Sequence, residues 1–155
     1  MTIYFISGAE GVGKSTLIKL LTKKLPKIDI HDFDEKGVPS NPPLSWRINT
    51  TKDWINLARD NEKKGMNTII VGLSFPSEIS NISKKIKPKY CLLDISIKER
   101  GNRLRKRKST IEVIEDKKQL LDLRKDFSKL KDKKVIKTSN KTSKEIVKEI
   151  IKWVK

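Results

Sequence analysis

Three glycines and a lysine stand at fixed spacing near the start of the chain, between an apolar segment and an amphipathic one. Residues 8–16 read GAEGVGKST, which satisfies the pattern G-x-x-x-x-G-K-S/T. Residues 2–7 (TIYFIS) have the composition of a short buried strand, and residues 14–25 have helical spacing with leucines on one side. A strand, a glycine-rich turn and a helix start in this order are typical of a loop that binds phosphate. The pattern therefore predicts a βα unit built around an anion.

The residue types in this loop have separate physical roles. The glycines let successive backbone N–H groups turn toward one anion, and the positive end of the following helix adds to the attraction. We expect Lys14 to reach the β- and γ-phosphates of ATP or GTP, and the Ser15 hydroxyl to hold Mg²⁺. The predicted nucleotide-binding residues of the loop are Gly8, Ala9, Glu10, Gly11, Val12, Gly13, Lys14, Ser15 and Thr16.

The remainder of the chain alternates between strand and helix patterns. Strands are predicted at 28–33, 68–73, 90–95 and 135–137, and helices at 51–64, 77–86, 98–107, 110–130 and 142–154. We expect Thr51 to cap the helix at 51–64, and the turn-rich residues 37–43 to form a loop. Alternation of this kind predicts an α/β fold of three layers, with a parallel sheet of about five strands flanked by helices. The 155 residues suffice for one domain spanning positions 1–155.

Charge is the most unusual property of the composition. The chain has 36 Lys and Arg against 19 Asp and Glu, a formal net charge of +17. Such an excess favours anionic partners, including nucleotides, phosphorylated metabolites and nucleic acids. Lysines scattered over solvated helix surfaces are the better explanation of this excess, so the charge does not select a partner.

Cysteine content and hydropathy indicate the cellular setting. Cys91 is the only cysteine and lies in an apolar run, so we expect a buried thiol and neither a disulfide nor a metal cluster. No apolar run is long enough to cross a membrane, and no basic region precedes the first apolar stretch. We therefore expect a cytoplasmic chain that does not associate with membranes.

Beyond the glycine-rich loop, the chain resembles, over nearly its full length, the P-loop kinase group that includes shikimate kinase, gluconate kinase and the nucleoside monophosphate kinases. This group often has a D-x-D pattern at the end of its second strand, where this chain has Asp32-Phe33-Asp34. Spacing of two puts both carboxylates on one face of an extended segment. The resemblance implies Asp32 as a magnesium ligand beside Ser15 and Asp34 as the carboxylate that orients an acceptor hydroxyl, although the two roles are interchangeable.

The basic segment at about 98–110 resembles the short lid of these kinases. Arg103 and Arg107 lie one helical turn apart, and the resemblance implies that they close over the phosphoryl group during transfer. A solvated basic helix face is the alternative interpretation.

Two further segments of the resemblance concern the acceptor and the nucleotide base. Residues at about 35–65 occupy the place of the acceptor-binding region, where Arg47 is the candidate for an anionic group and Trp46 for a stacking face. Thr138, Ser139 and Asn140 follow the last strand, where the group holds the base.

Two positions depart from the kinase pattern. Lys137 replaces a frequent acid near the base, and the third strand at 70–73 (IVGL) has no aspartate. Switch and motor ATPases need an acid on that strand, so its absence favours the shikimate kinase side of the group.

The leading prediction is a kinase that moves the γ-phosphoryl group of Mg-ATP to a small acceptor bearing a hydroxyl or a phosphate. A second hypothesis makes RNA the acceptor, because the basic segment could follow a phosphate backbone. Aromatic residues for base stacking are sparse there, which counts against it. A third hypothesis is a regulatory module that binds ATP or GTP without transferring phosphate.

Overall fold

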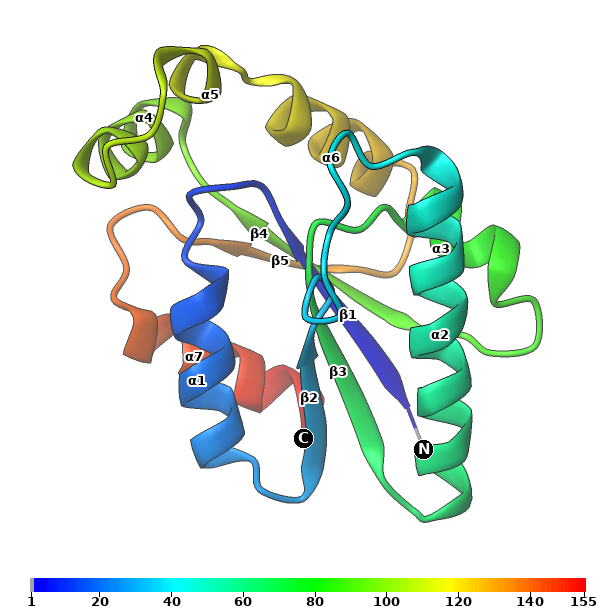
Figure 1. Ribbon diagram of the computed structural model, residues 1–155. Coiled ribbons are helices and arrows are strands. Elements are labelled where there is room, and N and C mark those ends of the chain that lie inside the picture. The colour runs from blue at the N-terminus through cyan, green and yellow to red at the C-terminus, as the bar shows by residue number, and fades with distance from the viewer. Residues whose placement is uncertain (1) are drawn as a thin grey trace.

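The computed structural model describes residues 2–155, which form a parallel five-stranded sheet covered by helices (Figure 1). The strands are β1 (Ile3–Gly8), β2 (Ile28–Asp32), β3 (Asn67–Gly72), β4 (Lys89–Asp94) and β5 (Lys134–Lys137), in the spatial order β2-β3-β1-β4-β5. The helices are α1 (Lys14–Lys24), α2 (Leu44–Lys63), α3 (Pro76–Ile82), α4 (Ile97–Lys106), α5 (Ile111–Glu115), α6 (Lys118–Ser128) and α7 (Ser143–Val154). The predicted α/β fold with about five parallel strands is confirmed.

The helices divide between the two faces of the sheet. Helices α1 and α7 contact each other on one face, whereas α2, α3 and α6 lie on the other, and α4 and α5 lie beyond the carboxyl ends of the strands (Figure 1). Because both faces are covered, the central strand β1 is buried along its whole length. Its neighbours β3 and β4 pair with it in parallel, so the loops that follow all three strands meet at one edge.

Burial follows the apolar pattern of the sequence. Large side chains such as Phe5, Trp54 and Phe127 are almost fully buried. Cys91 is buried as predicted, and burial raises the pKa of its thiol to about 12. Within residues 2–155, no helix combines the length and the apolar character needed to cross a bilayer.

Helix α2 begins earlier than predicted. It starts at Leu44, after Pro43 in an extended conformation, and Thr51 therefore lies inside the helix instead of capping it. Thr51 is buried, and its hydroxyl donates to the carbonyl oxygen of Arg47 one turn earlier. The polar residues at 49–53 interrupt the apolar spacing, so the sequence pattern failed to register the first two turns.

The single helix predicted at 110–130 is also wrong, because the chain forms two helices there. Asp116 adopts an extended conformation that ends α5, and its carboxylate accepts a hydrogen bond from the backbone N–H of Lys118 at 2.9 Å. Aspartate readily makes such a local bond in competition with the helical one. The break turns α6 back across the sheet.

The end of β2 is fixed by an aromatic residue of α2. The indole N–H of Trp54 donates to the carbonyl oxygen of Phe33 at 3.1 Å, and the Phe33 N–H donates to the carbonyl of Val71 at 2.8 Å. Phe33 is itself 1% exposed. Trp54 therefore holds the residue that separates the two predicted site carboxylates.

We expect Trp54→Phe to lower the free energy of unfolding by about 1–3 kcal/mol, because it leaves the buried Phe33 carbonyl without its donor. Urea unfolding followed by circular dichroism measures this loss. Trp153→Phe is the matched control, since Trp153 is half-buried against the Tyr4 ring and should cost less. Equal losses in the two variants would contradict the assigned role of the Trp54 hydrogen bond.

Candidate functional site

The glycine-rich loop (residues 8–16) connects β1 to α1 and curls around an open space. Gly11 and Gly13 have φ angles of 89° and 96°, in the left-handed region that residues with a Cβ rarely adopt. Gly13 is also the N-cap of α1, so no side chain caps the first turn of this helix. The N–H groups at the helix start are therefore available to an anion.

The side chain of Lys14 folds back across the glycine-rich loop. Its ammonium group donates to the carbonyl oxygen of Gly8 at 2.6 Å. Burial lowers the pKa of Lys14 to about 8, against the opposing effects of the carboxylates of Asp34, Asp32 and Glu10. A phosphate group entering the loop would add negative charge beside this buried ammonium and stabilise its protonated form.

One cavity of about 560 Å³ brings the glycine-rich loop together with the end of β2 and with the end of α4. We call it the loop cavity. Predicted site residues that line it are Glu10, Gly11, Gly13, Lys14, Ser15, Thr16, Asp32, Asp34 and Arg107. The parallel pairing of β2 with β3, and of β3 with β1, brings the two aspartates to the same edge as the loop.

Hydrogen bonds between neighbours hold the acidic segment in shape. The N–H of Asp34 donates to Oδ1 of Asp32 at 2.9 Å, and the N–H of Asp32 donates to Oε2 of Glu35 at 3.2 Å. Burial and the neighbouring Asp32 raise the pKa of Asp34, while Lys14 lowers it. Asp34 is therefore a better proton acceptor than an ordinary exposed aspartate.

His31 also helps to hold the acidic segment in shape. Its Nδ1 lies 2.6 Å from Oε1 of Glu35, and its Nε2 lies 2.9 Å from Oδ1 of Asp29. Burial alone would lower the pKa of His31, but bonds and charges from Asp29 and Glu35 outweigh it, so the pKa is raised. The centre of the ring also lies 4.9 Å from that of the Trp54 ring, with the two planes tilted by 31°. These contacts leave His31 engaged in structure and not aimed into the loop cavity.

The two predicted lid arginines lie in different surroundings. Arg107 lines the loop cavity, and its charge acts to lower the pKa of Lys14. Arg103 instead donates to the carbonyl oxygen of Val12 at 3.1 Å and forms an ion pair with Glu99 at 2.9 Å. Sequence reasoning missed Arg100, which is 3% exposed and donates to the carbonyl oxygen of Glu10 at 2.9 Å. Its spacing of four from the buried Leu104 was the available signal.

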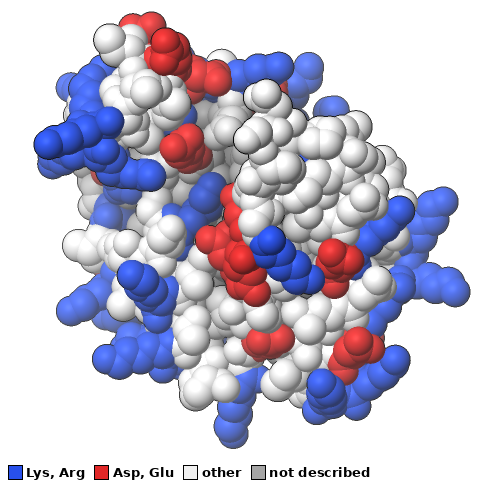
Figure 2. Space-filling model, viewed as in Figure 1, with Lys and Arg blue, Asp and Glu red and all other residues white. Residues whose placement is uncertain are grey.

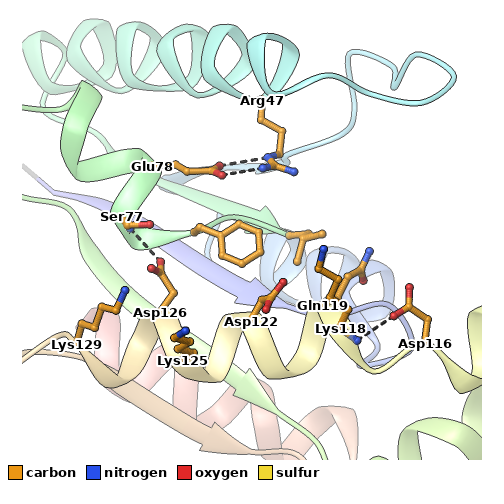
Figure 3. Close-up of a pocket in the computed structure, with 12 residues that line it drawn as sticks. Arg47, Ser77, Glu78, Asp116, Lys118, Gln119, Asp122, Lys125, Asp126 and Lys129 are labelled. Carbon is orange, nitrogen blue, oxygen red and sulfur yellow. Dashed lines mark hydrogen bonds and ion pairs between the residues drawn. The ribbon is translucent and has the colours of Figure 1, made fainter.

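Arg47 lines a second cavity of about 510 Å³, the side cavity, which adjoins the loop cavity because Leu73 and Gln119 line both. The Arg47 guanidinium donates twice to the Glu78 carboxylate, at 2.7 and 3.2 Å, and lies 5.6 Å from the Phe75 ring (Figure 3). Arg47 is thus already paired with an anion of the protein.

Trp46 makes a different set of contacts. Its ring meets Phe33 edge to face at 6.1 Å and packs against the core. Trp46 lines neither the loop cavity nor the side cavity, so the structure gives it a packing contact where the sequence suggested a stacking face.

Helix α6 supplies the floor of the side cavity, which the sequence did not predict. Asp122 points from α6 toward the pair formed by Arg47 and Glu78 (Figure 3), whereas the side-chain oxygen of Gln119 accepts a hydrogen bond from the N–H of Glu10 at 3.4 Å. Asp126 accepts a hydrogen bond from the N–H of Ser77 at 3.0 Å, which ties α6 to α3. Because α6 was expected as part of one long helix, its orientation across the sheet had no sequence signal.

The predicted base-contacting residues are committed to the backbone near α4. Thr138 donates through its N–H and its hydroxyl to the carbonyl of Asp94, at 2.7 and 3.1 Å. Ser139 accepts from the N–H of Ser96 at 2.9 Å, and the Asn140 N–H donates to Glu99 at 3.2 Å. These three residues form a loop beside α4 and do not line either cavity.

The structure explains why the third strand has no acid at its end. A Cβ added to Gly72 would lie 2.3 Å from Cβ of Phe33, far inside contact distance. Phe33 therefore occupies the space that a side chain at Gly72 would need. The acidic groups of this edge come from β2 instead.

The chain has the P-loop kinase fold of shikimate kinase. Solved structures with this fold cover 99% of the chain. A tunicamycin resistance protein from Deinococcus radiodurans has a TM-score of 0.73 and 19% identity over 95% of its length. A sugar kinase from a Janibacter species has a TM-score of 0.71 and 13% identity over 94% of its length. Shikimate kinase from Aquifex aeolicus has a TM-score of 0.64 and 23% identity over 96% of its length.

No protein-family model and no curated protein sequence matches the chain. At these low identities, the solved structures establish the fold and leave the chemistry to be argued from the site itself.

We expect Gly72→Ala to lower the free energy of unfolding by about 1–3 kcal/mol, because the added methyl group forces Phe33 away from the end of β3. Thermal or urea unfolding measures the change. Gly101→Ala is the control, since this glycine lies inside α4 and alanine should be neutral or stabilising there. A Gly72→Ala protein as stable as the wild type would show that Phe33 does not fill this space.

Proposed function

We propose that this protein is an ATP-dependent kinase that transfers the γ-phosphoryl group to a hydroxyl of a small acceptor. The observation that carries the proposal is the loop cavity, in which Lys14 and Ser15 face Asp32 and Asp34. A phosphate cradle next to a carboxylate pair suits transfer of a phosphoryl group better than binding alone. The fold shared with a sugar kinase and a shikimate kinase supports the same reaction class.

The glycine-rich loop would hold the phosphates of ATP. Backbone N–H groups at the start of α1 bind the phosphate oxygens, and Lys14 reaches the β- and γ-phosphates. Arg107 enters the same cavity from the end of α4, where its planar group can contact the charge on the transferring phosphoryl group.

The oxygen donors of the cavity fit Mg²⁺. The Ser15 hydroxyl and the Asp32 carboxylate are hard oxygen ligands, and Mg²⁺ in such sites takes one or two protein groups together with the substrate phosphates. In residues 2–155, no cluster of three His, Cys, Asp or Glu side chains offers a metal site of its own. When bound, Mg²⁺ would neutralise part of the phosphate charge during transfer.

Asp34 would act on the acceptor. Its raised pKa suits it to accept the proton of the acceptor hydroxyl as the oxygen attacks the γ-phosphorus. The bond from the γ-phosphorus to the oxygen bridging it to the β-phosphate breaks, and ADP leaves. The products are the phosphorylated acceptor, ADP and one proton.

The side cavity is the proposed acceptor site, because Leu73 and Gln119 connect it to the loop cavity. Its lining has four basic side chains, Arg47, Lys118, Lys125 and Lys129, and four acidic ones, Glu78, Asp116, Asp122 and Asp126. The lining residues therefore have no formal net charge, whereas the whole chain has a formal net charge of +17. Since Glu78 already satisfies Arg47, the cavity favours a polar acceptor with hydroxyl groups over one that carries a phosphate.

The surface around the loop cavity does not favour RNA as the acceptor. Figure 2 shows basic side chains spread along the margins of this face, with acidic side chains gathered near its middle, over the loop that follows β2. A bound polynucleotide would meet these carboxylates at the entrance to the site.

Lys14→Ala should lower phosphoryl transfer by about a hundredfold or more, because the charge on the transferred group loses its main positive partner. The measurement is transfer of labelled γ-phosphate from Mg-ATP to pooled sugars, sugar acids, nucleosides and nucleotides. Lys19→Ala, on the exposed side of α1, is the control for loss of one positive charge. Transfer retained by Lys14→Ala would contradict the kinase, and nucleotide binding without any transfer by the wild type would favour the regulatory module.

Asp34→Asn should lower kcat by about 10²-fold to 10⁴-fold while leaving the dissociation constant of Mg-ATP nearly unchanged, since the lost group acts on the acceptor. Steady-state kinetics and calorimetry give the two values. Asp53→Asn, an exposed position on α2, should match the wild type in both. A weakened nucleotide affinity with unchanged kcat in Asp34→Asn would assign Asp34 to the metal and Asp32 to the acceptor.

A further inference from the structure

The outer side of the glycine-rich loop is bound to α4. Nε of Arg100 donates to the carbonyl oxygen of Glu10 at 2.9 Å, and Nη1 of Arg103 donates to the carbonyl oxygen of Val12 at 3.1 Å. A Cβ added to Gly11 would lie 3.1 Å from the side chain of Leu104, so the helix and the loop are in close contact. The segment expected as a free lid is thus anchored at its first two turns.

These two bonds determine which way the loop's N–H groups point. In a trans peptide, the C=O of one residue and the N–H of the next point in opposite directions. With the Glu10 carbonyl held toward α4, the N–H of Gly11 is directed to the opposite side of its peptide plane. In the same way, the Val12 carbonyl is held toward α4 and directs the N–H of Gly13 to the opposite side of its peptide plane. Both glycines line the loop cavity.

Arg100 is the more constrained of the two arginines. It is 3% exposed, whereas the side chain of Arg103 is 29% exposed and also forms an ion pair with Glu99. A buried guanidinium is costly unless it is hydrogen bonded, and here a loop carbonyl supplies the bond. The use of a buried guanidinium to bind one backbone carbonyl indicates that the position of this carbonyl is important for the loop.

Helix α4 is also tied to the loop that follows β5. The Ser96 N–H donates to Ser139 at 2.9 Å, and Glu99 accepts from the Asn140 N–H at 3.2 Å while pairing with Arg103. The helix therefore connects the glycine-rich loop to the predicted base-contacting residues. These hydrogen bonds hold the opposite side of α4 in place, and so they fix the position of Arg100 relative to the glycine-rich loop.

We propose that Arg100 is a positioning residue for nucleotide binding, which it supports by holding the Glu10 carbonyl so that the Gly11 N–H faces the phosphates. This role rests on the proposed binding of ATP phosphates by the glycine-rich loop. Arg100 does not itself reach the phosphates, since it does not line the loop cavity.

The test compares two uncharged replacements of the same residue. Arg100→Gln places its amide nitrogen at the position along the side chain that Nε occupies in arginine, and therefore keeps a donor for the Glu10 carbonyl. Arg100→Met has similar length and no donor. Because both variants lose the positive charge, the difference between them isolates the hydrogen bond. Arg105→Met, an exposed arginine of the same helix, controls for charge at this end of the molecule.

Calorimetry with Mg-ADP gives the dissociation constant for each folded variant, and thermal unfolding gives its stability. We expect Arg100→Met to weaken Mg-ADP binding about tenfold relative to Arg100→Gln, the size of one net hydrogen bond between neutral groups. Arg105→Met should bind like the wild type. Equal affinities for Arg100→Met and Arg100→Gln would overturn the proposal, even if the Met variant melts earlier, because a merely structural residue changes stability alone.

Amide hydrogen exchange in the nucleotide-free protein tests the same role without any ligand. Residues 9–13 should exchange faster in Arg100→Met than in Arg100→Gln, while the strands keep their protection. Unchanged exchange would overturn the proposal. If the wild type failed to bind Mg-ADP, the proposed function would fall, and the exchange comparison would still decide whether Arg100 holds the loop.

Arg103→Met gives an independent version of the experiment should Arg100→Met not fold. It removes the parallel bond to the Val12 carbonyl, and we expect faster exchange at Gly13 and weaker Mg-ADP binding. Unchanged values for both quantities would overturn the view that α4 orients the loop.

Discussion

The parallel pairing of β1 with β3 on one side and β4 on the other is the constraint on which the rest of this structure depends. It places the glycine-rich loop at the centre of the edge formed by the carboxyl ends of the strands. The segments that follow β2, β3 and β4 begin at the same edge. Residues from distant parts of the sequence, such as Lys14, Asp34 and Arg107, therefore surround one cavity. In open parallel sheets this edge is the usual place for a ligand.

Within this arrangement, one aromatic contact decides where the acidic groups stand. Phe33 fills the space beside Gly72, and Trp54 holds the Phe33 carbonyl, so the end of β3 has no room for a side chain. The same contact fixes the residue between Asp32 and Asp34. This packing therefore leaves the end of the third strand without a side chain, and the acidic groups of this edge come from the end of β2 and the turn after it.

The basic segment after β4 has a different structural role from the one that its composition indicated. Its first arginines hold backbone carbonyls of the glycine-rich loop, and only Arg107 lines the loop cavity. The positive charge of this segment is thus divided between groups that hold the glycine-rich loop and one that lines the loop cavity. Composition could not separate these roles, because both use the same residue type at helical spacing.

The sequence by itself determined the βα unit at residues 2–25, the alternating order of strands and helices, and the residues of the glycine-rich loop, because these follow from local spacing and backbone chemistry. It also indicated the acidic pair, but the expected extended segment ends at Asp32, and Asp34 lies in the turn that follows, with its N–H donating to the Asp32 carboxylate. Only the tertiary structure decided that Glu78 neutralises Arg47, that Asp122 and Gln119 of α6 enter the side cavity, and that Arg100 binds the loop. The contacts of Arg47 and Arg100 join residues 31 and 90 positions apart, and their partners are set by how the helices pack across the sheet, which no local pattern records.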